Sequence, residues 1–193
     1  MTTLFSTGLF LLIAAITPGP NNLVVMRAAA RNGWRAALPA AAGVITGGLV
    51  LLAVVTAGAD GAFAAWPWLR GMIELAGVLY LVWLGTRMIA AAGEDAGSAA
   101  LPAGLPGLFA FQFLNPKGWV MVLTVVAALP GANGAHALLY LAPLFVCIPA
   151  ACLLLWAGLG GALAPYLGRP VVRQWTDRVL GALLILAALL LFT

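Results

Sequence analysis

The sequence predicts an all-α integral membrane protein with six transmembrane helices, arranged as two inverted three-helix repeats in which the first and fourth helices are interrupted. Three observations predict this fold class: a very apolar composition, six apolar stretches of membrane-spanning length, and an internal repeat. Apolar residues make up 64% of the 193 residues and charged residues 7%, whereas soluble domains hold about 45–50% and about 25%. Such a chain cannot cover itself with polar surface, so we expect its helices to face a lipid bilayer.

Six stretches of the chain are long and apolar enough to cross a bilayer, which takes about 20 residues for a hydrocarbon core of about 30 Å. The residues MTTLF at the start carry no basic group. We therefore expect the first stretch to be retained as a span and not removed as a secretory signal. The six predicted spans are 4–30, 36–58, 68–91, 107–129, 136–162 and 175–192.

Three pairs of motifs recur at offsets of 98, 100 and 103 residues, which predicts an internal repeat. They are Pro18 and Pro116, AGADGA (57–62) and AGLGGA (157–162), and the pairs Arg70/Glu74 and Arg173/Asp177. Three spans per half place the second half upside down relative to the first, as in many secondary transporters. We expect a first repeat over 1–92, a linker over 93–106 and a second repeat over 107–193, all within one membrane domain.

The distribution of arginine predicts the orientation. Seven arginines lie at the loops after spans one, three and five, and Arg70 lies at the opposite face; the seven are Arg27, Arg31, Arg35, Arg87, Arg169, Arg173 and Arg178. Cytoplasmic loops carry the excess of positive charge. The arginine-rich loops and the linker are therefore predicted to be cytoplasmic and both termini periplasmic.

Several classes of function are not expected. The arginines flank apolar spans and form no extended basic patch, so we expect no nucleic-acid partner. Cys147 and Cys152 are five residues apart on one helix, on different faces, and are predicted to be unbridged core residues. The chain has one histidine, no metal-ligand spacing, and no HExxH, GxSxG or pair of aspartates, so we expect no metal, no cofactor and no enzyme activity.

Two spans contain a helix breaker flanked by amides. The first break is TPGPNN (17–22) in span one, and the second break is FLNPKG (113–118) in span four. An interrupted helix leaves unpaired carbonyls at one end and unpaired N–H groups at the other, and inside a membrane these persist only where they are buried or line a cavity. Carbonyls suit an ammonium and N–H groups suit a carboxylate, the two charged groups of an amino acid. The alternative is a pair of proline kinks that only shape the bundle.

The residues of the two breaks are the predicted substrate-binding site. Pro20 is expected at the first turn of a second half-helix, Asn115 as an N-cap, and Pro116 after it. Gly19 and Gly118 allow close approach of the backbone. The site residues are Thr17, Pro18, Gly19, Pro20, Asn21, Asn22, Asn115, Pro116 and Lys117.

Lys117 is the most informative single residue because it lies about 15 Å from either membrane surface. Its side chain reaches about 6 Å, and a charge at this depth costs at least about 2.5–3.5 kcal/mol. Either a substrate carboxylate or an acid of the bundle such as Glu74 is expected to compensate this charge. Glu74 and Asp177 follow Arg70 and Arg173 by four residues, which fits local ion pairs at the membrane interface or a role in coupling or gating. Gly43 and Gly47 form a predicted close-packing motif in span two.

These motifs resemble the lysine exporter (LysE/RhtB) superfamily, in particular the RhtB-type exporters of homoserine, threonine and related amino acids. The match lies in TPGPNNLVV (17–25), RNGWRAAL (31–38) and FLNPKGWVM (113–121) and covers nearly the whole chain. The resemblance implies an exporter in the bacterial inner membrane, driven by protons, and carries over to Pro18, Gly19, Pro20, Asn21, Asn115, Pro116 and Lys117. Family members that export lysine or arginine have acids in span two, whereas ALPAAAGVITGGLVLLAVV (37–55) has none, which disfavours a cationic substrate. The segments NNL (21–23) and ALPAAAG (37–43) also resemble the branch of the family that exports cysteine and O-acetylserine.

The expected function is therefore a proton-coupled exporter of small neutral amino acids or their derivatives. The alternatives are an exporter of another small metabolite or ion, a channel-like pore, a membrane-embedded enzyme, and a membrane subunit that does not transport. A six-span chain is small for an alternating-access carrier, so a homodimer is a further expectation.

Overall fold

A computed structural model describes residues 2–59, 61, 65–92, 104–128 and 134–192, and these are helical with short connections and contain no strand. The fold class predicted from composition is thus confirmed as all-α. The helices are α1 (Thr2–Ile16), α2 (Pro20–Asn32), α3 (Leu38–Val54), α5 (Pro67–Ala90), α6 (Gly104–Phe113), α7 (Pro116–Ala127), α8 (Gly134–Leu163) and α9 (Pro170–Phe192), with short helical segments η1 (Trp34–Ala37), η2 (Val55–Ala59) and η3 (Ala164–Gly168).

The predicted breaks are present in the structure. Phe5–Ile16 and Pro20–Asn32 are bent by 52° at the first break, and Gly104–Phe113 and Pro116–Ala127 by 64° at the second. Each bent pair is apolar and long enough to be one broken span. Proline explains both positions, because it removes a backbone donor and clashes with the preceding turn.

The described residues contain three further helices of membrane-spanning length, which are Trp34–Gly58, Pro67–Ala90 and Gly134–Leu167. Length and composition thus qualify up to five spans, and they correspond to the first five predicted ones. The sixth predicted span, 175–192, lies inside the 23-residue helix α9 but is not among the qualifying helices. The structure therefore agrees with a helical membrane protein, and the six-span count remains a prediction.

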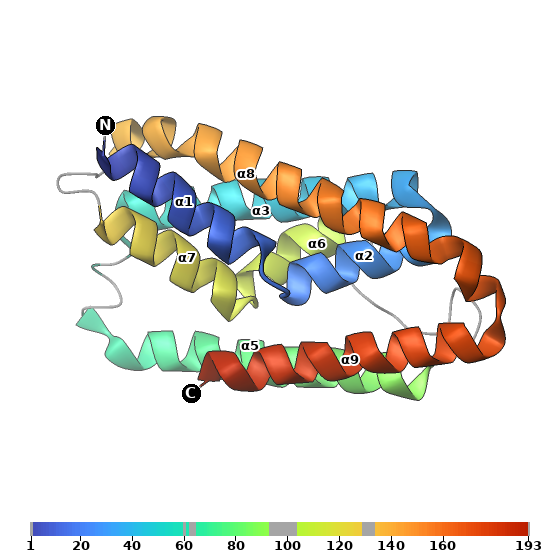
Figure 1. Cartoon of the computed structure of the whole chain (residues 1–193). Helices are drawn as coiled ribbons and strands as arrows, with labels where there is room; N and C mark the ends of the chain where they lie inside the picture. Colours follow the sequence, from blue (N-terminus) through green and yellow to red (C-terminus); the bar gives the residue numbers. More distant parts are fainter. Residues whose placement is uncertain (1, 60, 62–64, 93–103, 129–133, 193) are drawn as a thin grey trace.

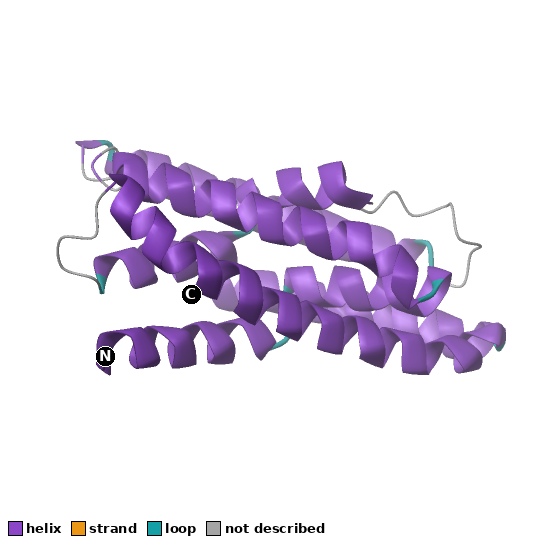
Figure 2. Cartoon of the chain, turned by 90° about the horizontal axis from the view of Figure 1, so that it is seen from above, coloured by secondary structure: helices purple, strands orange, loops and turns teal. Residues whose placement is uncertain are grey.

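The helices form an elongated bundle in which the two breaks lie near mid-length (Figure 1). Helix α2 packs along α8, α3 packs along α6, and α5 packs along α9. Figure 2 shows the same bundle from above, with the start of α1 and the end of α9 toward the same end. This placement agrees with an even number of passes along the bundle.

Glycines let several helices approach closely. A Cβ atom on Gly47 would lie 2.8 Å from the carbonyl oxygen of Phe109, so α3 contacts the backbone of α6. Gly43 meets the same helix at Leu105, which confirms the predicted close-packing motif. A Cβ atom on Gly181 of α9 would likewise lie 2.7 Å from the carbonyl oxygen of Gly85 of α5.

One pair of repeat motifs differs in conformation. Gly58, in the first glycine-rich motif, has φ of +110° in η2, which is a region that favours glycine. The second motif, 157–162, continues within helix α8. The two motifs therefore differ in backbone conformation, and the internal repeat stays a prediction. Residues 60 and 62–64, and 93–103 of the predicted linker, lie outside the described residues.

Candidate functional site

The last turn of α1 leaves carbonyl groups that the helix itself cannot pair. Side chains within the first break satisfy three of them. The Thr17 hydroxyl donates to the carbonyl of Ala14 at 2.9 Å. The Asn22 amide donates to the carbonyls of Ala15 at 2.8 Å and Thr17 at 2.9 Å. Asn22 is 5% exposed, so its amide replaces water for this helix end.

Two further donors reach the same helix end from the second half of the chain. The indole N–H of Trp156 donates to the carbonyl of Ile16 at 3.2 Å. The ammonium of Lys117 donates to the Thr17 carbonyl at 3.1 Å and to the Thr17 hydroxyl at 2.9 Å. Residues 100 and 140 positions away along the chain thus donate hydrogen bonds to the end of α1.

The start of α2 has no such side-chain partner. Gly19 is the N-cap residue in an extended conformation, and no side chain caps the helix there. Pro20 occupies the first turn, as predicted, where its missing N–H costs nothing. The free N–H groups and the positive end of the helix dipole lie at this point.

The second break is closed by its own residues. The N–H of Asn115 donates to Gln112 at 3.2 Å, and the Asn115 side chain accepts from the N–H of Lys117 at 3.2 Å. The indole of Trp119 donates to the carbonyl of Phe113 at 3.0 Å. The predictions of Asn115 as N-cap and of Pro116 after it are confirmed.

The position of Lys117 corrects one expectation. Its ammonium lies on Thr17, so the proposed ion pair with Glu74 is not the arrangement found. A cation at the C-terminal end of a helix is stabilised by the helix dipole. The lysine stem passes Gly19 so closely that a Cβ there would lie 2.9 Å from Nζ and 3.2 Å from Cδ. Glycine at this position therefore makes room for Lys117.

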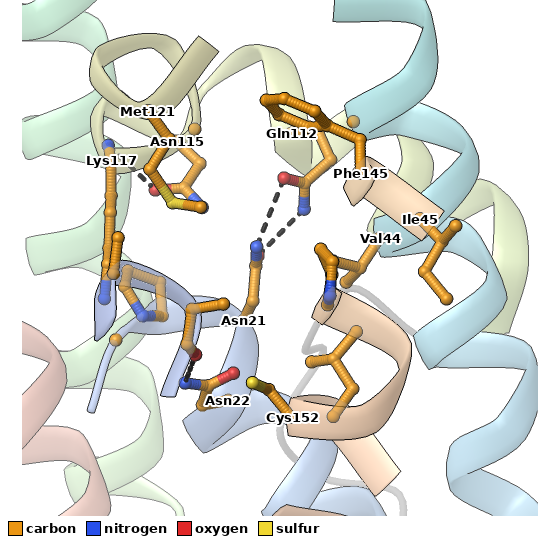
Figure 3. A pocket seen from close by; sticks show the side chains of 18 of the residues that line it. Asn21, Asn22, Val44, Ile45, Gln112, Asn115, Lys117, Met121, Phe145 and Cys152 are labelled. Atoms are coloured by element: carbon orange, nitrogen blue, oxygen red, sulfur yellow. Dashed lines mark hydrogen bonds between the residues drawn. The ribbon is translucent and has the colours of Figure 1, made fainter. Parts of the chain in front are cut away.

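A pocket of about 650 Å³, including its open mouth, lies between the two breaks (Figure 3). Thr17, Pro18 and Pro116 were predicted as site residues but are not among its lining; the predicted residues that do line it are Gly19, Pro20, Asn21, Asn22, Asn115 and Lys117.

Gln112 is the main lining residue that sequence reasoning did not single out. Its amide and that of Asn21 bond to each other twice, at 2.8 and 3.2 Å, across the pocket (Figure 3). Gln112 is 3% exposed, and its stem packs on Gly47, where a Cβ would lie 2.7 Å away. The available signal was a lone amide in an apolar span, which must find a partner inside the bundle.

The remaining walls of the pocket are apolar or weakly polar. They come from α3, α7 and α8 and include Val44, Ile45, Met121, Phe145 and Cys152. No aspartate or glutamate is among the lining residues. The structure separates the two cysteines, since Cys152 is buried and Cys147 is exposed. The expectation of two core cysteines is therefore wrong for Cys147.

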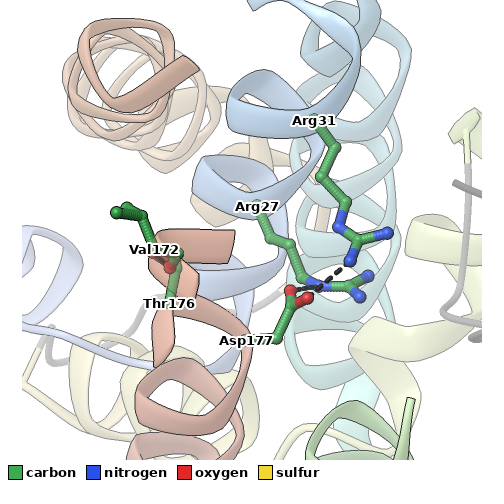
Figure 4. A network of polar contacts seen from close by, with 5 residues as sticks. All are labelled: Arg27, Arg31, Val172, Thr176 and Asp177. Carbon is green, nitrogen blue, oxygen red and sulfur yellow. Dashed lines mark hydrogen bonds and ion pairs between the residues drawn. The ribbon is translucent and has the colours of Figure 1, made fainter. Parts of the chain in front are cut away.

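A second polar cluster joins the two halves of the chain away from the pocket. Asp177 of α9, 2% exposed, binds the Nε of Arg27 at 2.8 Å and also binds Arg31, both from α2 (Figure 4). The sequence spacing predicts a partner for Asp177 on the same helix, Arg173. The two arginines that bind it here, Arg27 and Arg31, belong to another helix. The reason is long-range packing of α9 against α2, which no local spacing reveals.

The other predicted interface pair is less well defined. Glu74 is partly buried on α5, and the side chain of Arg70 lies outside the described residues. The Arg70/Glu74 pair therefore stays a prediction. No group of three potential metal ligands occurs in the part of the chain that was described.

Comparison with known proteins finds a family model and several relatives that match this chain. The family model for LysE type translocators matches residues 12–193. A cysteine/O-acetylserine efflux protein of Escherichia coli O139:H28 (strain E24377A / ETEC) is 30% identical over 186 residues, covering 95% of this chain and 94% of that protein. One from Salmonella choleraesuis (strain SC-B67) is 27% identical over 145 residues, covering 65% of this chain and 74% of that protein. No solved structure matches the chain.

Proposed function

Because this chain belongs to the family of LysE type translocators, we propose that it is a secondary active exporter of small neutral amino acids or their derivatives, driven by proton antiport across the bacterial inner membrane. The relatives named as cysteine/O-acetylserine efflux proteins support this class of substrate. The observation that carries the proposal is the pocket between the breaks, which brings Lys117 and the uncapped start of α2 together.

An amino acid fits this pocket by its two charged ends. The carboxylate would bind Lys117 and the uncapped N–H groups of α2, and the ammonium would bind the carbonyls at the end of α1. The side chain would face the amides of Asn21 and Gln112 and the apolar wall. A lining without acids disfavours a substrate with a cationic side chain.

The membrane arrangement is part of the proposal. Helix α9 would be the sixth span, the two halves would be inverted repeats, and both termini would face the periplasm. A cysteine at position 2, in a variant without Cys147 and Cys152, should react with an impermeant thiol reagent on intact spheroplasts. Labelling only after lysis would overturn this orientation. We also propose a homodimer, which chemical cross-linking in membranes would test.

The ion cluster around Asp177 is proposed to act in gating. Its two arginine partners link the first half to the second, so the cluster must part if the halves move against each other at that end. Glu74, Arg70 and Arg173, the other members of the two repeat-related pairs, are further candidates for coupling or gating.

An efflux assay in proteoliposomes tests the function. Purified protein would be reconstituted with a panel of radiolabelled amino acids inside, and efflux would be followed with and without an inward proton gradient. We expect efflux of small neutral amino acids such as cysteine, O-acetylserine, homoserine or threonine, accelerated by the gradient, and none of lysine. Efflux of lysine alone would overturn the substrate class, and efflux indifferent to the gradient would overturn proton antiport.

A further inference from the structure

The ammonium of Lys117 lies on a pair of acceptors that belong to the other half of the chain. These are the carbonyl oxygen of Thr17 at 3.1 Å and its hydroxyl oxygen at 2.9 Å. The carbonyl stands at the C-terminal end of the 15-residue helix α1. This end carries the negative pole of the helix dipole, which stabilises a cation, and Thr17 is exposed there.

The acceptors are held in place without Lys117. The Asn22 amide binds the Thr17 carbonyl at 2.9 Å, and the Thr17 hydroxyl donates to the carbonyl of Ala14 at 2.9 Å. A carbonyl has two lone pairs, so the Thr17 oxygen can serve Asn22 and a cation together. The end of α1 is therefore a preformed site for an N–H bearing cation.

Lys117 is a movable occupant of this site. Its aliphatic stem runs over Gly19 and borders the open pocket, and its hydrogen bonds in the structure are made by Nζ with neutral oxygens. A lysine side chain has four rotatable bonds and turns more readily than a backbone. Among the described residues, no acid forms an ion pair with it, which distinguishes it from the cluster at Asp177.

We infer that the C-terminal end of α1 is a binding site for a primary ammonium group, occupied in this structure by Lys117 and taken over by the α-ammonium of an amino acid when that substrate enters. The takeover rests on the proposed function, whereas the ammonium site itself does not. When the α-ammonium reaches Thr17, Lys117 turns away with its charge and pairs with the carboxylate of the same substrate. The net charge of the pocket is then unchanged, because a zwitterion adds no net charge.

The site can be tested without transport, by replacing the occupant with a free amine. The melting temperature of purified Lys117→Met would be measured in methylammonium chloride and, at equal concentration, in tetramethylammonium chloride and sodium chloride. We expect methylammonium to raise the melting temperature by several degrees more than either control salt, with saturation, because it alone has N–H donors of the right size. The wild type should not distinguish the three salts. Equal responses to all salts in Lys117→Met would overturn the ammonium site.

Two variants control this measurement. Thr17→Val in the Lys117→Met background removes the hydroxyl acceptor and should raise the half-saturating methylammonium concentration about tenfold. Arg35→Met removes an exposed cation elsewhere and should show no response specific to methylammonium. An unchanged half-saturation in the Thr17 double variant would contradict the assigned position.

A second variant covers poor folding. Lys117→Ala lacks the side chain beyond Cβ, and n-propylammonium supplies the three missing carbons and the ammonium. If Lys117→Met or Lys117→Ala folds only when its matching amine is present during purification, the site is supported; if no amine improves either variant, the site is refuted. The takeover is tested separately in wild-type proteoliposomes, where an exported amino acid should lose export when its α-ammonium is replaced by hydrogen. Export of that desamino acid at an equal rate would overturn the takeover and leave the ammonium site standing.

Discussion

In the second break, residues 111–119 pair one another: Asn115 caps the helix that follows, and Trp119 reaches back to the carbonyl of Phe113. In the first break, Gly19 provides no cap. Besides its own Thr17 and Asn22, the end of α1 receives donors from Trp156 and Lys117, far along the chain. A break that closes itself serves as a rigid base. A break whose carbonyls are paired by distant side chains can replace one of these donors by a ligand. We therefore place ligand exchange at the first break.

The largest expected effect comes from removing the first break itself. Replacing Pro18, Gly19 and Pro20 by alanine should allow α1 and α2 to join as one helix, since alanine is the best helix former and proline the worst. The acceptors for Lys117 and the free N–H groups would then disappear. We expect insertion into the membrane without any export in the proteoliposome assay. Normal efflux from this variant would mean that the break is only a kink.

Lys117→Met should have the next largest effect. Hydrogen bonds of a charged group are worth about 1.5–3 kcal/mol, which corresponds to a loss of about tenfold or more in export. The initial rate of efflux at low substrate concentration measures this loss. Adding Glu74→Gln should not restore export, because Lys117 is paired with Thr17 and not with Glu74. Recovery in the double variant would restore the ion-pair explanation.

Two glycine variants compare the breaks directly. A Cβ on Gly19 would meet Nζ of Lys117 at 2.9 Å, whereas a Cβ on Gly118 finds its nearest neighbour at 3.5 Å. Gly19→Ala should therefore displace the end of a flexible side chain, lowering export several-fold with little loss of stability. Gly118→Ala should leave export within a factor of about two, since it makes ordinary contacts and favours the helix. Equal losses of export in both variants would contradict the difference between the breaks.

The smallest effects concern the caps, and melting temperature measures them. Asn115→Ala removes one N-cap and should cost about 1 kcal/mol. Asn22→Ala removes two hydrogen bonds to carbonyls of α1 and should cost about 1–3 kcal/mol, because buried acceptors lose their donor. A larger loss of melting temperature from Asn115→Ala than from Asn22→Ala would contradict this ranking of the two side chains.

Features with a local cause could be predicted from the sequence. Proline and glycine predicted the breaks, Asn115 before Pro116 predicted an N-cap, and the length of the apolar stretches predicted the helices. The partners of charged and amide side chains could not be predicted in the same way. Lys117 meets Thr17 across 100 residues, and Asp177 meets Arg27 across 150, because these contacts depend on how the helices pack.

The site shows the same division. Asn21 was expected at the site from its motif, but its partner Gln112 lies 91 residues away on another half-helix. The carbonyls at the end of α1 were expected to bind the ammonium of a substrate, and the structure places the ammonium of Lys117 there. The spacing of residues shows which groups need a partner, and only the packing of helices shows which partner they find.

The two breaks are proposed to form one site in which Lys117 binds the carboxylate of an amino acid. The most direct test is equilibrium binding of an exported amino acid and of its methyl ester, to the wild type and to Lys117→Met. The ester keeps the ammonium and the side chain but loses the negative charge. The account predicts that the wild type binds the amino acid much more tightly than the ester, and that Lys117→Met loses about tenfold of this preference, keeping only the part due to the N–H groups of α2. A preference for the amino acid that persists unchanged in Lys117→Met would contradict it.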